Sequence, residues 1–257
     1  MIGDRELLAF RQGYYELLVS FFRQEPAGEI LLRASSGISE RIEAARNFHP
    51  LLAEGWAQLE HFFAETPAAA LAETGADEYT RLFIGPYDPK INPYESFYFT
   101  GRMWDRPLAD LRTFLKAVGI EKQDGYAEPE DALAFELEVM RWLTGKQQAA
   151  TDSEEETRWL RLQSEFLKNH LLIWAPTCGR DIEASQGAKL YRGMAMILRG
   201  FLDTERGLFR EWGVEPVAPL EEVRKLHMAI PMWKGPTFEG AIPDQGGKTT
   251  PPVDKKN

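Results

Sequence analysis

Residues 10–22 read Phe-Arg-Gln-Gly-Tyr-Tyr-Glu-Leu-Leu-Val-Ser-Phe-Phe, and this stretch sets the helical pattern of the whole chain. Its apolar side chains follow steps of four, three, one, three and one residues, which place them on a single face of an α-helix. Pro26 then ends the helix. The residues on the apolar face are Phe10, Tyr14, Leu17, Leu18, Phe21 and Phe22.

The same spacing recurs along the chain, so the sequence predicts an all-α fold. Pro50 suits the first turn of a second helix, Asp152 precedes three glutamates that favour a helix start, and Gly119 and Gly207 end two further helices. No stretch of alternating β-branched residues predicts a sheet. We therefore expect a single helical-bundle domain over residues 1–206.

Two segments depart from the helical pattern. Residues 85–101 contain three prolines and several aromatic residues, so we expect a non-helical central loop that packs against the body. Residues 207–257 form a predicted C-terminal extension of irregular structure. Within it, the apolar stretch 227–233 is expected to dock on the body or on a partner, and residues 244–257 are expected to be disordered.

Composition excludes several classes of protein. The net charge of -10 over 257 residues has the wrong sign for broad binding to nucleic acid. A single cysteine, Cys178, leaves no intramolecular disulfide and no multi-thiolate metal site. No basic leader precedes an apolar core at the N-terminus, and no apolar run reaches the length of a membrane span. We expect a cytoplasmic protein without a membrane-inserted segment.

The motifs of the common enzyme and metal sites are absent. No histidine has a glutamate three residues before it, as a di-iron helical bundle requires; the four are His49, His61, His170 and His227. Gly247-Lys248-Thr249 resembles the end of a phosphate loop, but Ile242 stands where that motif needs glycine. Cys178 fits no thiol-enzyme pattern. The sequence predicts no catalytic residue, no metal and no cofactor.

Three short motifs stay unexplained by helix packing alone. Residues 79–86 form a helix end rich in aromatics, and residues 93–98 form a Pro-aromatic loop. The third, at 128–131, reads Glu-Pro-Glu-Asp and also suits an acidic helix start. Together the three resemble the TorD/DmsD/NarJ family of cytoplasmic molybdoenzyme maturation chaperones. The resemblance covers roughly residues 8–206, and it departs from the family pattern at Ala132, where the family has histidine.

The resemblance implies a function. Chaperones of this family bind the twin-arginine leader, or an N-terminal segment, of an apo catalytic subunit until the molybdenum cofactor is inserted. The expected partner is therefore the apo catalytic subunit of a molybdenum redox enzyme. A leader with two arginines beside an apolar run needs an apolar groove next to carboxylates. The residues predicted to bind the client peptide are Tyr79, Leu82, Phe83, Tyr87, Pro93, Tyr94, Ser96, Tyr98, Glu128 and Asp131.

Two alternatives stay open at this level. A helical enzyme or metal-binding protein could use the carboxylates between 128 and 138 as acid, base or ligands. A helical scaffold that remains in its complex would need no site at all. The sequence leaves open the client, the oligomeric state and nucleotide binding.

Overall fold

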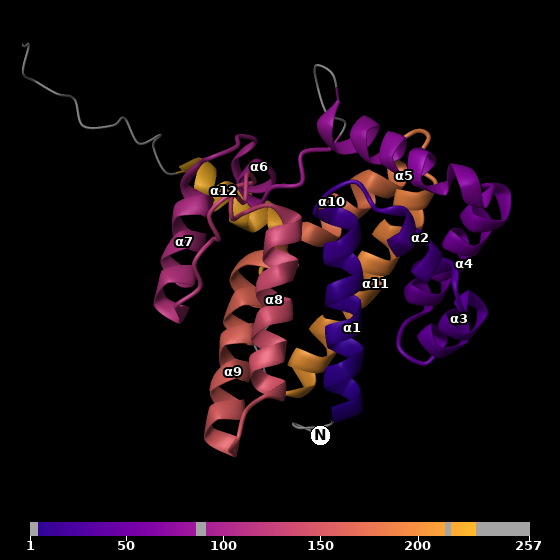
Figure 1. Ribbon diagram of the computed structural model, residues 1–257. Coiled ribbons are helices and arrows are strands. Elements are labelled where there is room, and N and C mark those ends of the chain that lie inside the picture. The colour runs from indigo at the N-terminus through magenta and orange to yellow at the C-terminus, as the bar shows by residue number, and fades with distance from the viewer. Residues whose placement is uncertain (1–4, 86–90, 214–216, 230–257) are drawn as a thin grey trace, which may run out of the picture.

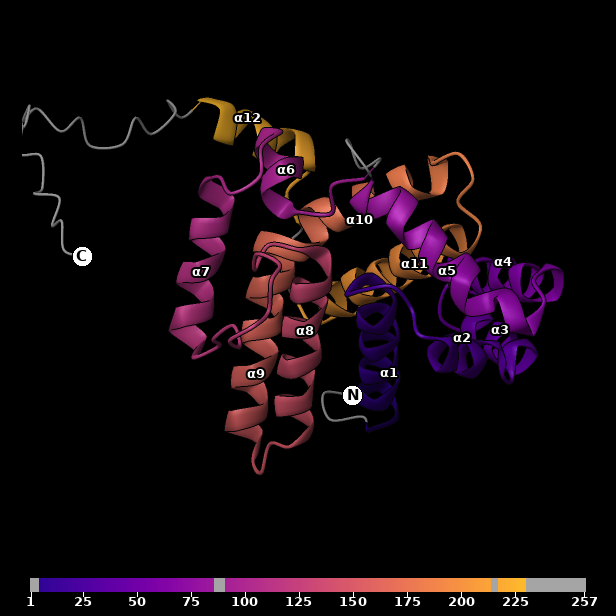
Figure 2. The ribbon, with the colours of Figure 1, turned by 45° about the horizontal axis from the view of Figure 1, so that its top comes forward.

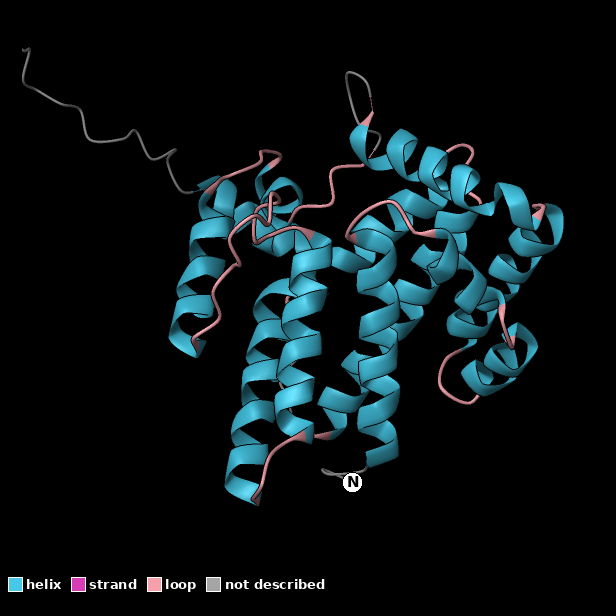
Figure 3. Ribbon diagram, viewed as in Figure 1, coloured by secondary structure: helices cyan, strands magenta, loops and turns pink. Residues whose placement is uncertain are grey.

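The computed structural model describes residues 5–85, 91–213 and 217–229. The regular structure in these ranges is helical and contains no β-strand, which confirms the all-α prediction (Figure 3). None of the described helices is long and apolar enough to cross a membrane. In chain order the elements are α1 (Arg5–Phe22), α2 (Gly28–Ser35), α3 (Ile38–Arg46), α4 (Pro50–Glu65), η1 (Ala68–Ala70), α5 (Leu71–Tyr79), η2 (Thr80–Ile84), α6 (Glu95–Thr100), α7 (Arg106–Val118), α8 (Leu133–Gln148), α9 (Ser153–Phe166), η3 (Leu167–Leu171), α10 (Leu172–Ala184), α11 (Leu190–Glu211) and α12 (Leu220–Ala229).

The long helix α11 lies at the centre of the bundle and packs against both α4 and α10. Helix α1 packs against α8, which in turn packs against α9. Figure 1 shows α1, α8 and α9 side by side, with α2 to α5 on one flank and α7 on the other. Figure 2, turned by 45°, shows the same arrangement with α12 lying beside α6.

Two glycines allow α4 and α11 to approach closely. A Cβ atom on Gly55 would lie 2.7 Å from a side-chain carbon of Ile197, and one on Gly200 would lie 2.7 Å from the backbone nitrogen of Leu52. Both distances are far inside van der Waals contact, so any larger residue would push the helices apart. The tight crossing fixes the position of α11 against the flank.

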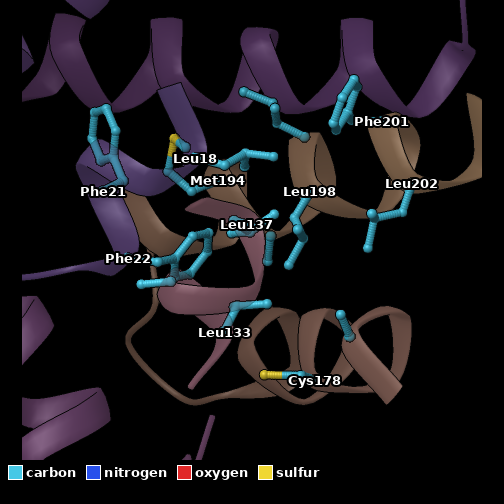
Figure 4. Packing of buried hydrophobic residues seen from close by; sticks show 14 of the residues in the cluster. Leu18, Phe21, Phe22, Leu133, Leu137, Cys178, Met194, Leu198, Phe201 and Leu202 are labelled. Atoms are coloured by element: carbon cyan, nitrogen blue, oxygen red, sulfur yellow. The ribbon is translucent and has the colours of Figure 1, made fainter. Parts of the chain in front are cut away.

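The apolar stripes of the helices meet in one continuous core. Leu18 of α1, Leu137 of α8 and Met194, Leu198 and Phe201 of α11 are all fully buried. Figure 4 shows these side chains converging between the three helices. The stripe of α1 thus packs where the sequence pattern predicted, on the interior side of the bundle.

Three of the predicted helix start and stop signals lie at helix ends in the structure. Pro50 occupies the first turn of α4, and Gly119, with φ of +74°, follows the end of α7. Oδ1 of Asp152 accepts a hydrogen bond of 2.8 Å from the backbone N–H of Glu155 at the start of α9. These signals depend only on neighbouring residues, which is why the sequence reveals them.

A buried ion pair joins α1 to α11 inside the bundle. Both Arg11 and Glu205 are 0% exposed, and Nε and Nη2 of Arg11 donate to the two carboxylate oxygens at 2.6 and 2.8 Å. Nη2 also donates to Gln163 of α9 at 2.7 Å, and the hydroxyl of Tyr15 donates to Glu205 at 2.7 Å. Burial acts to lower the pKa of Arg11, but the charge and hydrogen bonds of Glu205 raise it overall, so the guanidinium stays charged.

The predicted central loop is wrong in part. Residues 95–100 form α6 instead of irregular chain, because Pro93 precedes the first turn and leaves the helical N–H groups intact. The expectation that the segment packs against the body holds for its described residues, since Ile91, Tyr98 and Phe99 are buried. Tyr87 lies outside the described residues.

The predicted end of α11 is also wrong. The helix continues through Gly207 to Glu211, because Phe209 is buried beneath the Arg11 guanidinium, 5.3 Å from it, and holds the last turns. The extension contains a helix, α12, whose Arg224 donates from Nε to the carbonyl of Tyr98 at 2.6 Å. The predictions for 244–257, and for 227–233 beyond Ala229, concern residues outside the described ranges.

Replacing Arg11 by methionine should lower the free energy of unfolding by about 3–5 kcal/mol, because Glu205 would remain charged and buried without its partner. Urea denaturation at pH 7 measures the change. The matched control is Arg46→Met, which removes an exposed pair with Glu43 and should cost at most about 1 kcal/mol. Equal losses for the two variants would show that the buried pair is not a main support of the bundle.

Candidate functional site

Two motifs that are more than thirty residues apart in the sequence meet as a backbone clasp, formed by residues 93–96 and 131–133. The N–H of Leu133 donates to the carbonyl of Pro93, and the N–H of Glu95 donates to the carbonyl of Asp131, both at 2.9 Å. Tyr94 and Ala132 lie opposite each other in an isolated antiparallel bridge. The clasp therefore holds the Pro-Tyr loop and the Glu-Pro-Glu-Asp turn in a fixed relation.

The side chain of Asp131 completes the clasp. Its Oδ2 accepts a hydrogen bond of 3.1 Å from the backbone N–H of Ser96, in the first turn of α6. The alternative that Asp131 caps its own helix is wrong, because α8 begins at Leu133 and Ala132 makes no side-chain cap. Asp131 is 0% exposed, and its side chain accepts from an N–H group in the first turn of α6 instead.

The exposed edge of the clasp carries a tyrosine–carboxylate pair. The hydroxyl of Tyr94 donates to Oε2 of Glu128 at 2.6 Å, and Glu128 is exposed. Burial, followed by the hydrogen bond to Glu128, raises the pKa of Tyr94, so its hydroxyl stays protonated and keeps donating. No described residue donates a hydrogen bond to the second oxygen of Glu128.

An aromatic group lies next to this pair. The ring of Phe83 lies 5.1 Å from that of Tyr79 and 5.0 Å from that of Tyr191, and both Tyr79 and Phe83 are half-buried. Burial and the nearby charge of Glu128 raise the pKa of Tyr79 to about 12. Glu128 therefore lies within electrostatic range of the aromatic group. The site thus combines a partly exposed apolar surface with an accessible carboxylate.

The element that carries Phe83 is a π-helical turn, η2. Leu82 on this turn is buried, and its carbonyl accepts a 3.0 Å hydrogen bond from the N–H of Ile91. The turn is therefore tied to residues 91–93, which lead into the clasp. Single π-helical turns occur often at functional sites, where they reorient side chains.

The structure divides the predicted site residues into two groups. Tyr79, Phe83, Pro93, Tyr94 and Glu128 have accessible surface near one another. The other described residues are buried; they are Leu82, Ser96, Tyr98 and Asp131. The hydroxyl of Tyr98 donates to Asp181 of α10 at 2.8 Å, so this side chain faces the body and not the clasp edge.

Three carboxyl groups are buried beneath the clasp. Of these, Asp131 was predicted to bind the client, and Glu136 was named only in the enzyme alternative. Glu95, Asp131 and Glu136 are at most 1% exposed. Oε1 of Glu95 contacts Nδ1 of His170 at 2.9 Å, and Glu136 accepts from Nε1 of Trp174 at 3.1 Å. Oε2 of Glu95 and Oδ1 of Asp131 have no hydrogen-bond partner among the described residues.

The electrostatics of this cluster require protons on some of the carboxyl groups. Burial raises the pKa of Glu95 and of Glu136 well above the usual value, and the neighbouring acidic groups add to the effect. Burial lowers the pKa of His170 to about 4, so its contact with Glu95 is a hydrogen bond between neutral groups at pH 7. His170 therefore supplies no positive charge at pH 7, and burial favours the protonated form of both glutamates.

Two further features were missed by sequence reasoning. Tyr126 lies close enough to Tyr79 to affect its pKa, and the guanidinium of Arg23 lies 5.2 Å from the Tyr126 ring. Glu78 is buried and accepts hydrogen bonds from the N–H groups of residues 189–191, which caps α11 from α5.

The sequence signal for the burial of Glu136 was its position between Phe135 and Leu137 in an apolar helix face.

The protonated carboxyl groups make stability depend on pH. A carboxyl whose folded pKa is raised stabilises the fold below its unfolded pKa, and this contribution is lost as the pH rises toward the folded pKa. Above the unfolded carboxyl pKa, each such group should lower the free energy of unfolding by up to about 1.4 kcal/mol per pH unit until it ionises in the fold. Neutral His170 has the opposite dependence, but only below about pH 6.5, as the unfolded histidine gains its proton.

Glu136→Gln should therefore flatten the decline in stability between pH 7 and 8, because an amide can accept from Trp174 without ever ionising. Urea denaturation at pH 7.0 and 8.0 measures the difference between variant and wild type. Glu73→Gln, on the exposed face of α5, is the control and should keep the wild-type slope. Parallel profiles for wild type and Glu136→Gln would mean that Glu136 is already ionised in the fold.

The carboxylates of the enzyme alternative do not form a metal site. Glu130 pairs with Arg112 at 2.7 Å, and Glu138 pairs with Arg141 at 2.8 Å. Within residues 5–85, 91–213 and 217–229, no group of three or more histidine, cysteine, aspartate or glutamate side chains is placed to hold a metal ion.

Comparison with known proteins identifies relatives of the chain. The family model described as nitrate reductase delta subunit matches residues 46–179. The chain is 26% identical over 152 residues to the perchlorate reductase assembly chaperone protein of Dechloromonas aromatica, which covers 56% of this chain and 68% of that protein. It is 26% identical over 132 residues to the chaperone protein TorD of Vibrio cholerae, covering 51% of this chain and 60% of that protein.

The family match includes the candidate site. A further TorD chaperone, from Aeromonas salmonicida, is 29% identical over 127 residues, covering 49% of this chain and 56% of that protein. The matched relatives are named as chaperones and not as enzymes, which supports the prediction that this chain is not an enzyme. The family match contains η2, the clasp and the buried carboxyl groups, and it spans just over half of the 257 residues. On this basis the chain belongs to the nitrate reductase delta subunit family, which confirms its resemblance to the TorD and NarJ chaperones.

Proposed function

We propose that this protein is a maturation chaperone for a molybdenum-containing redox enzyme and that it binds the N-terminal, twin-arginine-type leader or the apo form of the catalytic subunit. The observation that carries the proposal is the half-buried aromatic group of Tyr79 and Phe83 beside the exposed Glu128. The chaperone names of its relatives support the same conclusion.

The physical basis is complementarity to a basic, apolar leader. The apolar run of the leader would bury surface against Tyr79 and Phe83, at about 25 cal/mol for each Å² removed from water. A guanidinium group of the leader would bind the open carboxylate oxygen of Glu128. The net charge of -10 would increase the rate of encounter with a basic peptide.

The buried residues have a different role in this proposal. Asp131 and Ser96 hold the clasp, so they position Tyr94 and Glu128 and do not touch the peptide. Leu82 anchors η2 from below, and Tyr98 ties α6 to α10. Pro93 and Tyr94 form the rim of the site. The contact of Tyr87 with the client stays a prediction. The family histidine is not needed to form the clasp, because Ala132 contributes only its backbone bridge.

Holding the leader in the cytoplasm would delay export or assembly until the cofactor is inserted. In this scheme the protein performs no covalent chemistry. It releases the leader when the mature subunit competes for it or folds around it, as expected of a binding site with moderate affinity.

Glu128→Gln should weaken binding of the leader peptide about tenfold at low salt, because a charge-assisted bond shielded by bound peptide contributes about 1.5–3 kcal/mol. Isothermal titration with a synthetic leader peptide, at low and high salt, measures the change. Glu73→Gln, which makes the same change of charge on α5, should bind like wild type.

Thermal melts must show that all variants are folded. A second variant, Phe83→Ala, should weaken binding at both salt concentrations, because it removes apolar contact and not charge. If the leader binds wild type and Glu128→Gln equally well at both salt concentrations, Glu128 is not part of the site. If the leader does not bind wild type at all, the proposed function is wrong.

A further inference from the structure

A second concave surface lies between η3, α10, the C-terminal half of α11 and residues 217–220. It encloses a cavity of about 820 Å³. Leu167, Leu172 and Phe209 form an apolar floor, and each is at most 3% exposed. A cavity of this size with an apolar floor is typical of a binding site and not of a packing defect. We call it the basic groove, because of the side chains on its rim.

The rim of the basic groove is rich in arginine. Arg199, Arg206 and Arg210 all lie on α11, separated by seven and four residues, so they share one face of the helix. At 1.5 Å per residue they form a row about 16 Å long. Arg180 of α10 lies on the same rim, and Asp203 is the only acidic residue among the residues that line the cavity.

The charges on this rim are only partly neutralised. Arg199 pairs with Glu183 at 2.7 Å, and Arg206 pairs with Asp203 at 3.0 Å. Arg180 donates to the hydroxyl of Thr177 and has no carboxylate partner among the described residues. The guanidinium of Arg210 has neither an ion pair nor a hydrogen bond in the described part of the chain, and both Arg180 and Arg210 are exposed. In a chain of net charge -10, this is a local excess of positive charge.

We propose that the basic groove binds an acidic, amphipathic segment of the client polypeptide, an inference that rests on the proposed chaperone function and adds a second contact to it. The row of guanidinium groups fits carboxylates spaced along a peptide, because the positive charges are spread over about 16 Å. A single phosphate group would need them to converge on one point. The apolar floor receives the apolar face of such a segment.

Helix α11 connects the two sites. Tyr191 near its start contacts Phe83 of the leader site, and Arg206 lies fifteen residues further along, about 22 Å away along the axis. An extended linker of about seven residues spans that distance. One client chain can therefore occupy both sites, and the second contact then forms at a high effective concentration.

The test uses a fluorescent synthetic peptide of about 14 residues, roughly 21 Å long as a helix, made of glutamate, leucine and alanine with glutamate on one face. Its control has glutamine in place of glutamate. Fluorescence anisotropy at low salt should show binding of the acidic peptide and not of the control. The double variant Arg180→Ala/Arg210→Ala should lose at least tenfold in affinity.

The matched control variant is Arg5→Ala/Arg33→Ala, which changes the net charge by the same amount at two exposed positions outside the groove. It should bind like wild type. Hydrogen exchange should show protection of residues 217–222 by the acidic peptide and of residues 79–83 by the leader peptide. The groove variant should bind the leader peptide alone with wild-type affinity.

The outcomes separate the two proposals. The inference is overturned if the acidic peptide does not bind, or if both double variants bind it with equal affinity. It is also overturned if inorganic pyrophosphate competes at a lower concentration than unlabelled acidic peptide does, which would indicate a small-anion site. If wild type does not bind the leader peptide, the proposed function is overturned instead. Binding of the acidic peptide would still test the basic groove independently.

Discussion

The ion pair of Arg11 and Glu205 lies in the interior of the bundle, and the surrounding helices supply hydrogen-bond partners for both side chains. Four helices supply the partners: Arg11 and Tyr15 from α1, Gln147 from α8, Gln163 from α9 and Glu205 from α11. The Arg11 guanidinium also lies 5.3 Å from the ring of Phe209, which forms part of the floor of the basic groove. Because an unpaired buried charge is so costly, this network restricts how α11 can sit against the other helices. Both proposed binding surfaces depend on that placement.

The clasp solves a similar problem on a smaller scale. The first turn of α6 has N–H groups without partners, and the buried carboxylate of Asp131 and its carbonyl satisfy two of them from another part of the chain. The cost is a cluster of buried carboxyl groups, and burial raises the pKa of Glu95 and of Glu136, which favours their protonated forms. A rigid backbone edge results, and it presents Tyr94 and Glu128 at the surface beside the aromatic group of η2.

The candidate site could be found in outline from the sequence, but its members could not be ranked. The motifs at 79–86, 93–98 and 128–131 were recognised because their order and spacing resemble a known family. The sequence alone gave Asp131 and Glu128 the same role, although one is enclosed and the other exposed. It also missed Tyr126 and the arginines of the basic groove. Arg199, Arg206 and Arg210 look like ordinary polar positions of an amphipathic helix until α10 and residues 217–220 enclose the space beside them.

The sequence by itself determined the all-α class, several of the helices with their ends, and the family. Apolar spacing, Pro50, Asp152 and Gly119 act through residues within a few positions, so their effect is visible in the sequence. Only the tertiary structure decided which polar groups are buried and what they pair with. Arg11 finds Glu205 across 194 positions, and Asp131 caps a helix 35 positions earlier. It also extended α11 past Gly207, because the packing of Phe209 outweighs the weak helix propensity of one glycine. Long-range pairing and burial have no local period, and so no pattern in the sequence reveals them.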